Sequence, residues 1–83
     1  MSLIAAQVSL YPLRRPSIGP VIRDAVRALR ESGLETRMGE MNTLVWGEEE
    51  DVFQALQSAF HQAAQSGDTV MTVTLSNACP SPE

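Results

Sequence analysis

Aromatic, hydroxyl and amide side chains are placed along this chain in a way that suits the binding of a small ring. Tyr11 and Trp46 could stack on a heteroaromatic ring, or could form the apolar centre of a subunit interface, where both residue types are enriched. Asn42 and Thr43 carry an amide and a hydroxyl at an expected turn, where they could bind a ligand or serve turn formation alone. The candidate ligand-binding residues are Gln7, Ser9, Tyr11, Asn42, Thr43 and Trp46.

The other reactive residues give little support for catalysis or metal binding. Cys79 is the single cysteine, so no internal disulfide or cysteine-based metal site can form. His61 is the single histidine, and we expect it on the surface of a helix. The acids at positions 48–51 fall where a helix should begin, and the helix dipole explains them better than a metal does. We expect no enzyme activity, no catalytic residue, no metal ion and no cofactor beyond the ligand itself.

The length and the charge of the chain narrow its choice of partners. With 83 residues it forms one domain near the lower limit for a self-sufficient core, so we expect a homo-oligomer. Six arginines and no lysine against ten acids give a net charge of -4, which opposes binding to nucleic acid. No apolar run reaches the ~20 residues of a membrane helix, and the cysteine usage fits a reducing cytoplasm. A cytoplasmic protein with a neutral or cationic ligand is expected, without a membrane or nucleic-acid partner.

The apolar pattern predicts alternating strands and helices. Apolar residues at every second position indicate strands, and apolar residues three or four positions apart indicate helices. Ser17 is the expected N-cap of the first helix, and Gly33 and Gly67 are the expected helix ends. Ile18 and Phe60 are expected on helix faces that pack against the sheet. The predicted strands are Leu3 to Tyr11, Leu34 to Met38, Thr43 to Gly47 and Thr69 to Ser76, and the predicted helices run from about Ile18 to Ser32 and from about Glu48 to Ser66.

This order of elements predicts a ferredoxin-like βαββαβ sandwich, an α+β fold. We expect a four-stranded antiparallel sheet with two helices on one face, formed by residues 1–77, and a flexible tail at residues 78–83. The other sheet face would be left uncovered and would suit a subunit, a ligand or both. The residues expected on that face are Gln7, Ser9, Tyr11, Leu44, Trp46, Thr72 and Thr74.

Longer stretches of the chain resemble the small thiamine-binding protein family. The match covers about Ile4 to Leu75 and is carried by Val8 to Leu13, Ala28 to Leu34, Met41 to Glu48 and Val52-Phe53. The resemblance implies a ferredoxin-like domain that binds thiamine or its hydroxymethylpyrimidine fragment without catalysis. It also implies assembly into dimers or tetramers through sheet faces, with the ligand held near the subunit contacts.

Two positions depart from the pattern of this family. Its usual turn, Pro-Met-Gly-Thr, is replaced by Glu40-Met41-Asn42-Thr43, and Asn tolerates the positive φ that Gly allows. The residue before Gly47 is commonly acidic in the family but is Trp46 here. An indole replaces a carboxylate at that position, and it can stack on a ring or lie over a cation. The leading interpretation is a ligand held by the turn and the uncovered sheet face.

Other functions share the predicted strand order. An RNA-binding module would stack bases on Tyr11 and Trp46, but the acidic charge balance and the lack of a basic-glycine-aromatic signature oppose it. A dimeric α+β-barrel enzyme would need a titrating residue in its pocket, for which His61 is the available candidate. A purely structural oligomerisation module would need neither base-stacking aromatic residues nor a titrating residue.

Overall fold

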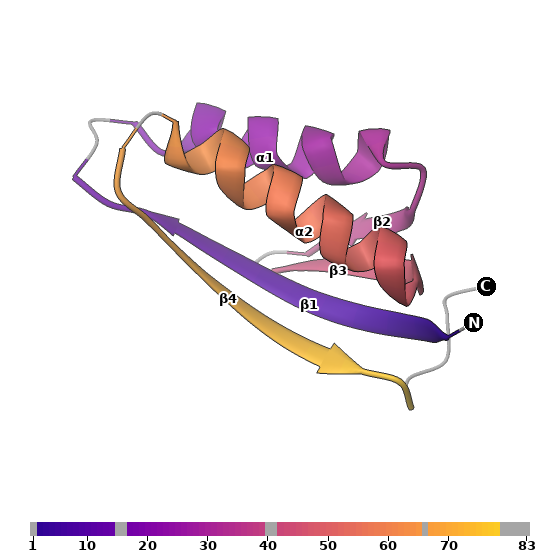
Figure 1. Ribbon diagram of the computed structural model, residues 1–83. Helices are drawn as coiled ribbons and strands as arrows, with labels where there is room; N and C mark the ends of the chain where they lie inside the picture. Colours follow the sequence, from indigo (N-terminus) through magenta and orange to yellow (C-terminus); the bar gives the residue numbers. More distant parts are fainter. Residues whose placement is uncertain (1, 15–16, 40–41, 66, 79–83) are drawn as a thin grey trace.

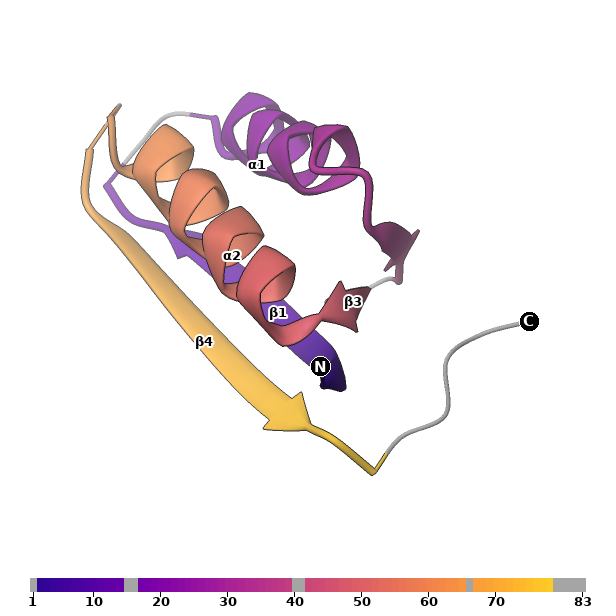
Figure 2. The same cartoon turned by 45° about the vertical axis from the view of Figure 1, so that its right-hand side comes forward.

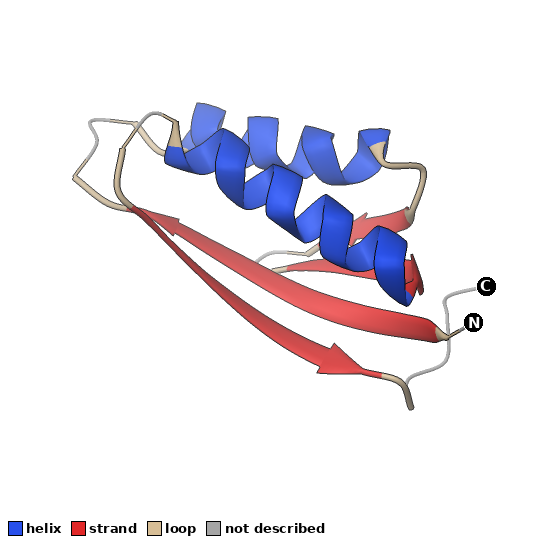
Figure 3. Ribbon diagram, viewed as in Figure 1, coloured by secondary structure: helices blue, strands red, loops and turns tan. Residues whose placement is uncertain are grey.

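The computed structural model describes residues 2–14, 17–39, 42–65 and 67–78, and its elements follow the predicted order. Both helices lie on one side of a curved sheet, and no described element covers the other side (Figure 1). Figure 3 shows the same two layers coloured by element type. The predicted ferredoxin-like α+β fold is confirmed. The elements are β1 (Leu3–Pro12), α1 (Gly19–Glu31), β2 (Glu35–Met38), β3 (Thr43–Glu48), α2 (Glu49–Ala64) and β4 (Thr69–Ser76).

The four strands lie in the order β2-β3-β1-β4, and each neighbouring pair is antiparallel. Ala6 of β1 pairs with Val45 of β3 and is buried. The next residue, Gln7, pairs with Leu44 on one side and with Thr74 on the other. Because successive side chains of a strand point to opposite faces, the Ala6 row faces the helices and the Gln7 row faces away from them. The register therefore confirms which residues lie on the uncovered face.

The core lies between the helices and the sheet and is built largely from small side chains. Leu29, Val45 and Val52 are its largest fully buried residues. Three alanines of α2, at positions 55, 59 and 63, are also buried, which lets this helix lie close to the sheet. Figure 2 shows α2 running over β1, with α1 beside it. Few large apolar groups are buried, so each one makes a large contribution to the stability of this chain.

Gly47 is required by packing at the end of β3. It faces the helices opposite Ile4, and the side chain of Leu34 occupies the space that a Cβ atom at this position would need. A larger residue at position 47 would displace Leu34, which is partly buried against the core. Within the Trp46-Gly47-Glu48 segment, Gly47 therefore has a structural role, which is to leave space for Leu34.

The start of α1 differs from the prediction. The helix begins at Gly19, with Ile18 rather than Ser17 at the N-cap position and no side-chain cap bond. A cap at Ser17 would place Pro20 third in the helix, where a capping side chain needs an N–H that proline lacks. Ile18 consequently lies outside the helix and is 47% exposed, so its predicted core role is wrong. At the other end, Gly33 has the positive φ of 85° expected for a helix end.

Phe60 was also expected in the core, but it is 40% exposed. It lies seven residues after Phe53, which is 49% exposed, so both rings fall on the same flank of α2. The opposite flank, which includes Ala55 and Ser58, faces α1. Helical spacing alone does not distinguish a residue at the centre of the buried face from one at its margin, which explains the error.

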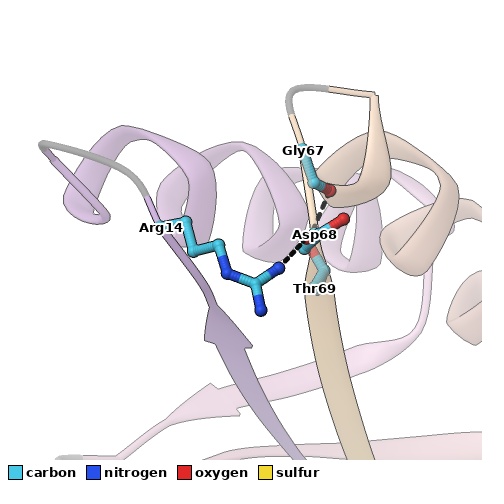
Figure 4. Close-up of polar contacts among 4 residues, drawn as sticks. All are labelled: Arg14, Gly67, Asp68 and Thr69. Carbon is cyan, nitrogen blue, oxygen red and sulfur yellow. Dashed lines mark hydrogen bonds and ion pairs between the residues drawn. The ribbon is translucent and has the colours of Figure 1, made fainter.

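An ion pair joins the two loops at one end of the sheet. Arg14 follows β1 and its Nη1 atom lies 2.5 Å from a carboxylate oxygen of Asp68, just before β4 (Figure 4). The backbone N–H of Leu13 donates to the carbonyl oxygen of Asp68 at 2.9 Å. Arg14 has a positive φ of 57°, which the loop imposes on a non-glycine residue. Both charged side chains are mostly exposed, so the contact orients the loops more than it stabilises the fold.

At the N-terminal end, the carbonyl oxygen of Ser2 accepts a hydrogen bond from the N–H of Glu49 at 2.8 Å. Most of the predicted tail, residues 79–83 with Cys79, lies outside the described residues, and Ala78 before it is exposed. Within the described parts of the chain, no helix is long and apolar enough to cross a membrane.

Because Leu29 is fully buried, truncating its side chain should strongly destabilise the fold. We expect Leu29→Ala to lower the free energy of unfolding by about 3 kcal/mol, because it removes buried methyl groups and leaves a cavity. Leu3→Ala is the matched control, since Leu3 is 68% exposed, and it should change stability by less than ~0.5 kcal/mol. Urea unfolding followed by circular dichroism at one fixed protein concentration measures both. Equal losses in the two variants would contradict the assignment of the core.

Candidate functional site

A small cavity opens between α1, β1 and the turn that joins β2 to β3. Its volume is about 100 Å³. Apolar side chains from β1 and α1 form its walls, and Met38 lies beside the turn at its mouth. Asn42 and Thr43 add polar side chains to the lining, and Ser9 of β1 also contributes to it. Among the described residues that line this cavity, none carries a charge. The remaining lining residues are Val8, Leu10, Ile22, Val26, Leu29 and Gly39.

Thr43 supplies the polar group that is most deeply buried in this cavity. It is the first residue of β3 and pairs with Val8 and Met38, on the sheet face that the helices cover. Its exposed fraction is 7%, and within the described parts of the chain its hydroxyl has no hydrogen-bond partner. Leaving a buried hydroxyl unpaired costs about 1–3 kcal/mol. The cavity wall therefore presents a donor and acceptor that a bound molecule could pair.

Asn42 lies beside Thr43 at the mouth of the cavity. Its carbonyl oxygen accepts a hydrogen bond from the N–H of Gly39 at 2.7 Å, which closes the turn. A Cβ atom at Gly39 would lie 3.2 Å from that carbonyl oxygen and 3.3 Å from Oδ1 of Asn42. Gly39 thus allows the amide of Asn42 to lie close over the turn. Glu40 and Met41 lie outside the described residues, so the expected positive φ at Asn42, which depends on Met41, stays a prediction.

The other candidate residues lie on the far side of the sheet. Trp46 pairs with Ala5 of β1, whereas Tyr11 pairs with Val70 of β4. Position 5 and position 11 are separated by about 20 Å along β1 at ~3.3 Å per residue. Tyr11 and Trp46 of one chain therefore cannot enclose a ring between them. Gln7 lies between them on the same face.

The structure thus divides the candidate residues into two groups. The cavity brings together Asn42 and Thr43, and Ser9 also lines it, although the register places the Ser9 side chain in the row that faces away from the helices. Gln7, Tyr11 and Trp46 belong to the uncovered face. Sequence reasoning missed the apolar walls of the cavity, because they belong to the same helix and strand patterns that define the core. The turn itself was the one signal in the sequence that pointed to this place.

Other reactive groups lie away from the cavity. His61 is exposed on α2, as predicted, and its Nε2 atom lies 3.3 Å from Nε2 of Gln65. The acids Glu49, Glu50 and Asp51 occupy the first turn of α2, where the helix dipole favours them. In the described ranges, no cluster of three or more His, Cys, Asp or Glu side chains could hold a metal ion.

Replacing Thr43 by an apolar residue of similar shape should stabilise the ligand-free protein. Without ligand, Thr43→Val should raise the free energy of unfolding by about 1 kcal/mol, because it removes a buried hydroxyl that has no partner. The control is Thr36→Val, since the Thr36 hydroxyl donates to the carbonyl oxygen of Leu34 at 3.2 Å. That variant should lose stability. Chemical denaturation of both variants provides the comparison, and a loss of stability in Thr43→Val as large as in the control would show that its hydroxyl is paired.

Solved structures share this fold at low sequence identity. A hypothetical protein from Methanocaldococcus jannascii has a TM-score of 0.86 and 19% identity, over 99% of this chain and 87% of that one. A domain of unknown function, DUF77, from Bacillus cereus has a TM-score of 0.82 and 17% identity, over 90% and 75%. A Thermotoga maritima protein assigned provisionally to thiamine biosynthesis or salvage has a TM-score of 0.79 and 19% identity, over 88% and 81%.

Sequence comparison places the chain in a family. No curated protein sequence matches it. The sequence profile of the YKOF-related family, in contrast, matches residues 3–82. This match begins at the first residue of β1 and continues past the end of β4, so it includes every strand and helix that builds the cavity. The chain therefore belongs to the YKOF-related family.

Proposed function

We propose that this chain is a non-catalytic binding protein for thiamine or a related pyrimidine such as hydroxymethylpyrimidine. The observation that carries the proposal is the buried hydroxyl of Thr43, which has no hydrogen-bond partner among the described residues, in the wall of a largely apolar cavity. An aminopyrimidine has ring nitrogens and an amino group that can pair with this hydroxyl and with the amide of Asn42. The thiamine-related role assigned provisionally to the Thermotoga maritima structure supports the same ligand class.

The size of the cavity favours a single ring over a larger ligand. A dry cavity of ~150 Å³ can hold benzene. The cavity of this chain, at about 100 Å³, is smaller and open at the turn. It could take one edge of a pyrimidine ring between the apolar walls, with the rest of that ring at the open mouth, and a second linked ring would have to lie outside. Hydroxymethylpyrimidine, with its single ring, is therefore the better match to the cavity than the whole of thiamine.

The charge of the cavity lining and of the chain further narrows the choice of ligand. The lining has no charged side chain among the described residues, and the chain has a net charge of -4. A phosphorylated ligand would lose hydration at the cavity without gaining an opposite charge there. We therefore propose that the neutral pyrimidine and the cationic thiamine bind more tightly than thiamine phosphates.

The same lining supports binding rather than catalysis. The polar side chains on the helix side of the cavity are the hydroxyl of Thr43 and the amide of Asn42. None of these groups titrates near neutral pH, so none is suited to act as a general acid or base. His61 is the histidine that an enzyme function would need, and it lies in solvent on α2.

The proposal also concerns the uncovered sheet face, which we assign to contacts between copies of the chain. Tyr11 is half exposed on this face, and Leu44 and Trp46 are partly exposed. Large aromatic and aliphatic groups of this kind are enriched at subunit contacts. We propose that copies associate through these faces, so that Trp46 serves the assembly rather than the ring-binding cavity.

Calorimetric titration of the wild-type chain with hydroxymethylpyrimidine, thiamine and thiamine diphosphate tests the proposed function. We expect micromolar binding of the first two ligands and weaker binding of the third. Thr43→Val should weaken the binding of hydroxymethylpyrimidine about tenfold or more, because the ring loses its buried hydrogen-bond partner. Thr36→Val, which changes the same atoms outside the cavity lining, should leave the affinity unchanged.

Two results would contradict this proposal. One is the absence of heat with every thiamine-related compound, combined with an unchanged fluorescence of Trp46, the single tryptophan. The other is binding that persists unchanged when Asn42 and Thr43 are both replaced. If the combined replacement of Asn42 and Trp46 also had no effect, neither the turn nor the uncovered face would hold the ligand.

A further inference from the structure

One side chain at the cavity mouth is half exposed, although its strand position belongs to the helix-covered row. Met38 ends β2 and pairs with Thr43, which pairs in turn with Val8. Residues directly opposite one another on neighbouring strands point to the same face of the sheet. Val8 and Thr43 are 3% and 7% exposed, whereas Met38 is 52% exposed and lines the cavity. Met38 therefore lies on the side of the sheet that holds the cavity, with much of its surface in water.

The position of β2 at the edge of the sheet explains this exposure. β2 comes first in the strand order β2-β3-β1-β4, so among the described strands Met38 has a neighbour on one side. The cavity of about 100 Å³ lies between this part of the sheet and α1, whose residues Ile22 and Val26 line its wall. Met38 thus borders the cavity rather than a packed side chain there. A molecule in the cavity would bury Met38 further.

A methionine at this place suits contact with a flat ring. Its side chain is unbranched and flexible, and a thioether makes favourable contacts with aromatic rings at a sulfur distance of ~5 Å. The Cβ atoms of directly opposite residues lie ~4.5–5.5 Å apart, so the thioether of Met38 can reach across the hydroxyl of Thr43. The other described lining residues at the turn are Gly39, which has no side chain, and Asn42, which is polar. Among the described lining residues, Met38 is therefore the large apolar side chain at the mouth.

We propose that Met38 closes over a single pyrimidine ring bound at Thr43 and thereby selects that ligand over thiamine. This inference rests on the proposed function. A ring with one edge in the cavity leaves its outer part at the open mouth, where water reaches it. The side chain of Met38 packs on that outer part, so apolar surface of both the ring and Met38 is removed from water. The bound ring supplies the apolar neighbour that Met38 lacks at the cavity.

Thiamine prevents this closure because it carries a second ring. In thiamine, a thiazolium ring linked through a methylene group stands where hydroxymethylpyrimidine has a small hydroxyl. With the pyrimidine edge in the cavity, the thiazolium ring lies at the mouth, in the space that the Met38 side chain needs. Met38 then stays in water and its contact with the pyrimidine is lost. The mouth therefore discriminates between the two ligands by their shape, through a clash with the wrong one as well as a contact with the right one.

Calorimetric titration of Met38 variants with hydroxymethylpyrimidine and with thiamine tests this inference. We expect Met38→Ala to weaken the binding of hydroxymethylpyrimidine about fivefold, because the ring loses its apolar cover, and to leave the binding of thiamine unchanged or tighter. Met38→Gln keeps the length of the side chain but is polar, and it should weaken the binding of hydroxymethylpyrimidine to a similar extent. The matched control is Met38→Leu, which keeps an apolar side chain of similar volume and should bind hydroxymethylpyrimidine within about twofold of the wild type.

The use of two ligands separates a selective contact from a general loosening of the fold, which would weaken both ligands alike. Urea unfolding of each variant confirms that it is folded. Three results would overturn the inference while the proposed function stands: an unchanged affinity of Met38→Ala for hydroxymethylpyrimidine, an equal loss for both ligands, or a wild-type chain that prefers thiamine. A wild-type chain that binds neither ligand would contradict the proposed function itself, and the role of Met38 would be rejected with it.

Discussion

The structure depends on the register in which β1 pairs with β3 on one side and β4 on the other. This pairing aligns Ala6 with Val45 and Leu75 and sets the whole apolar row beneath the helices. A shift of one residue would turn every side chain of the strand to the other face and would expose the core row. In a chain with so few large buried residues, such a loss would leave too little buried apolar area to stabilise the fold. The positions of all candidate site residues follow from this single alignment.

The cavity and the core share their walls, so the proposed ligand binding would be linked to stability. Leu29 is fully buried and also lines the cavity with Thr43, whose hydroxyl has no partner among the described residues. An apolar residue at position 43 would suit the ligand-free fold better, since a buried hydroxyl without a partner destabilises it. A ligand that pairs the hydroxyl would remove this penalty and would stabilise the folded state in proportion to its affinity.

Ligand binding and assembly use different parts of the molecule in our proposals. The cavity lies by α1 and the turn between β2 and β3, whereas the proposed contact between copies uses the sheet face that the helices do not cover. A face-to-face contact of two sheets would therefore lie on the opposite side of the sheet from the cavity.

The sequence by itself determined the order of elements, the strand faces and the turn at residues 39–42, because alternation, helical spacing and turn residues are local properties. It did not show that Phe60 lies at the margin of its helix face or that Tyr11 and Trp46 stand far apart. Those facts depend on how α2 lies relative to α1 and on strand register. The burial of Thr43 likewise needed the pairing with Val8 and the position of α1 above it. Only the tertiary structure decided these points, because burial and distance depend on neighbours that are remote in the chain.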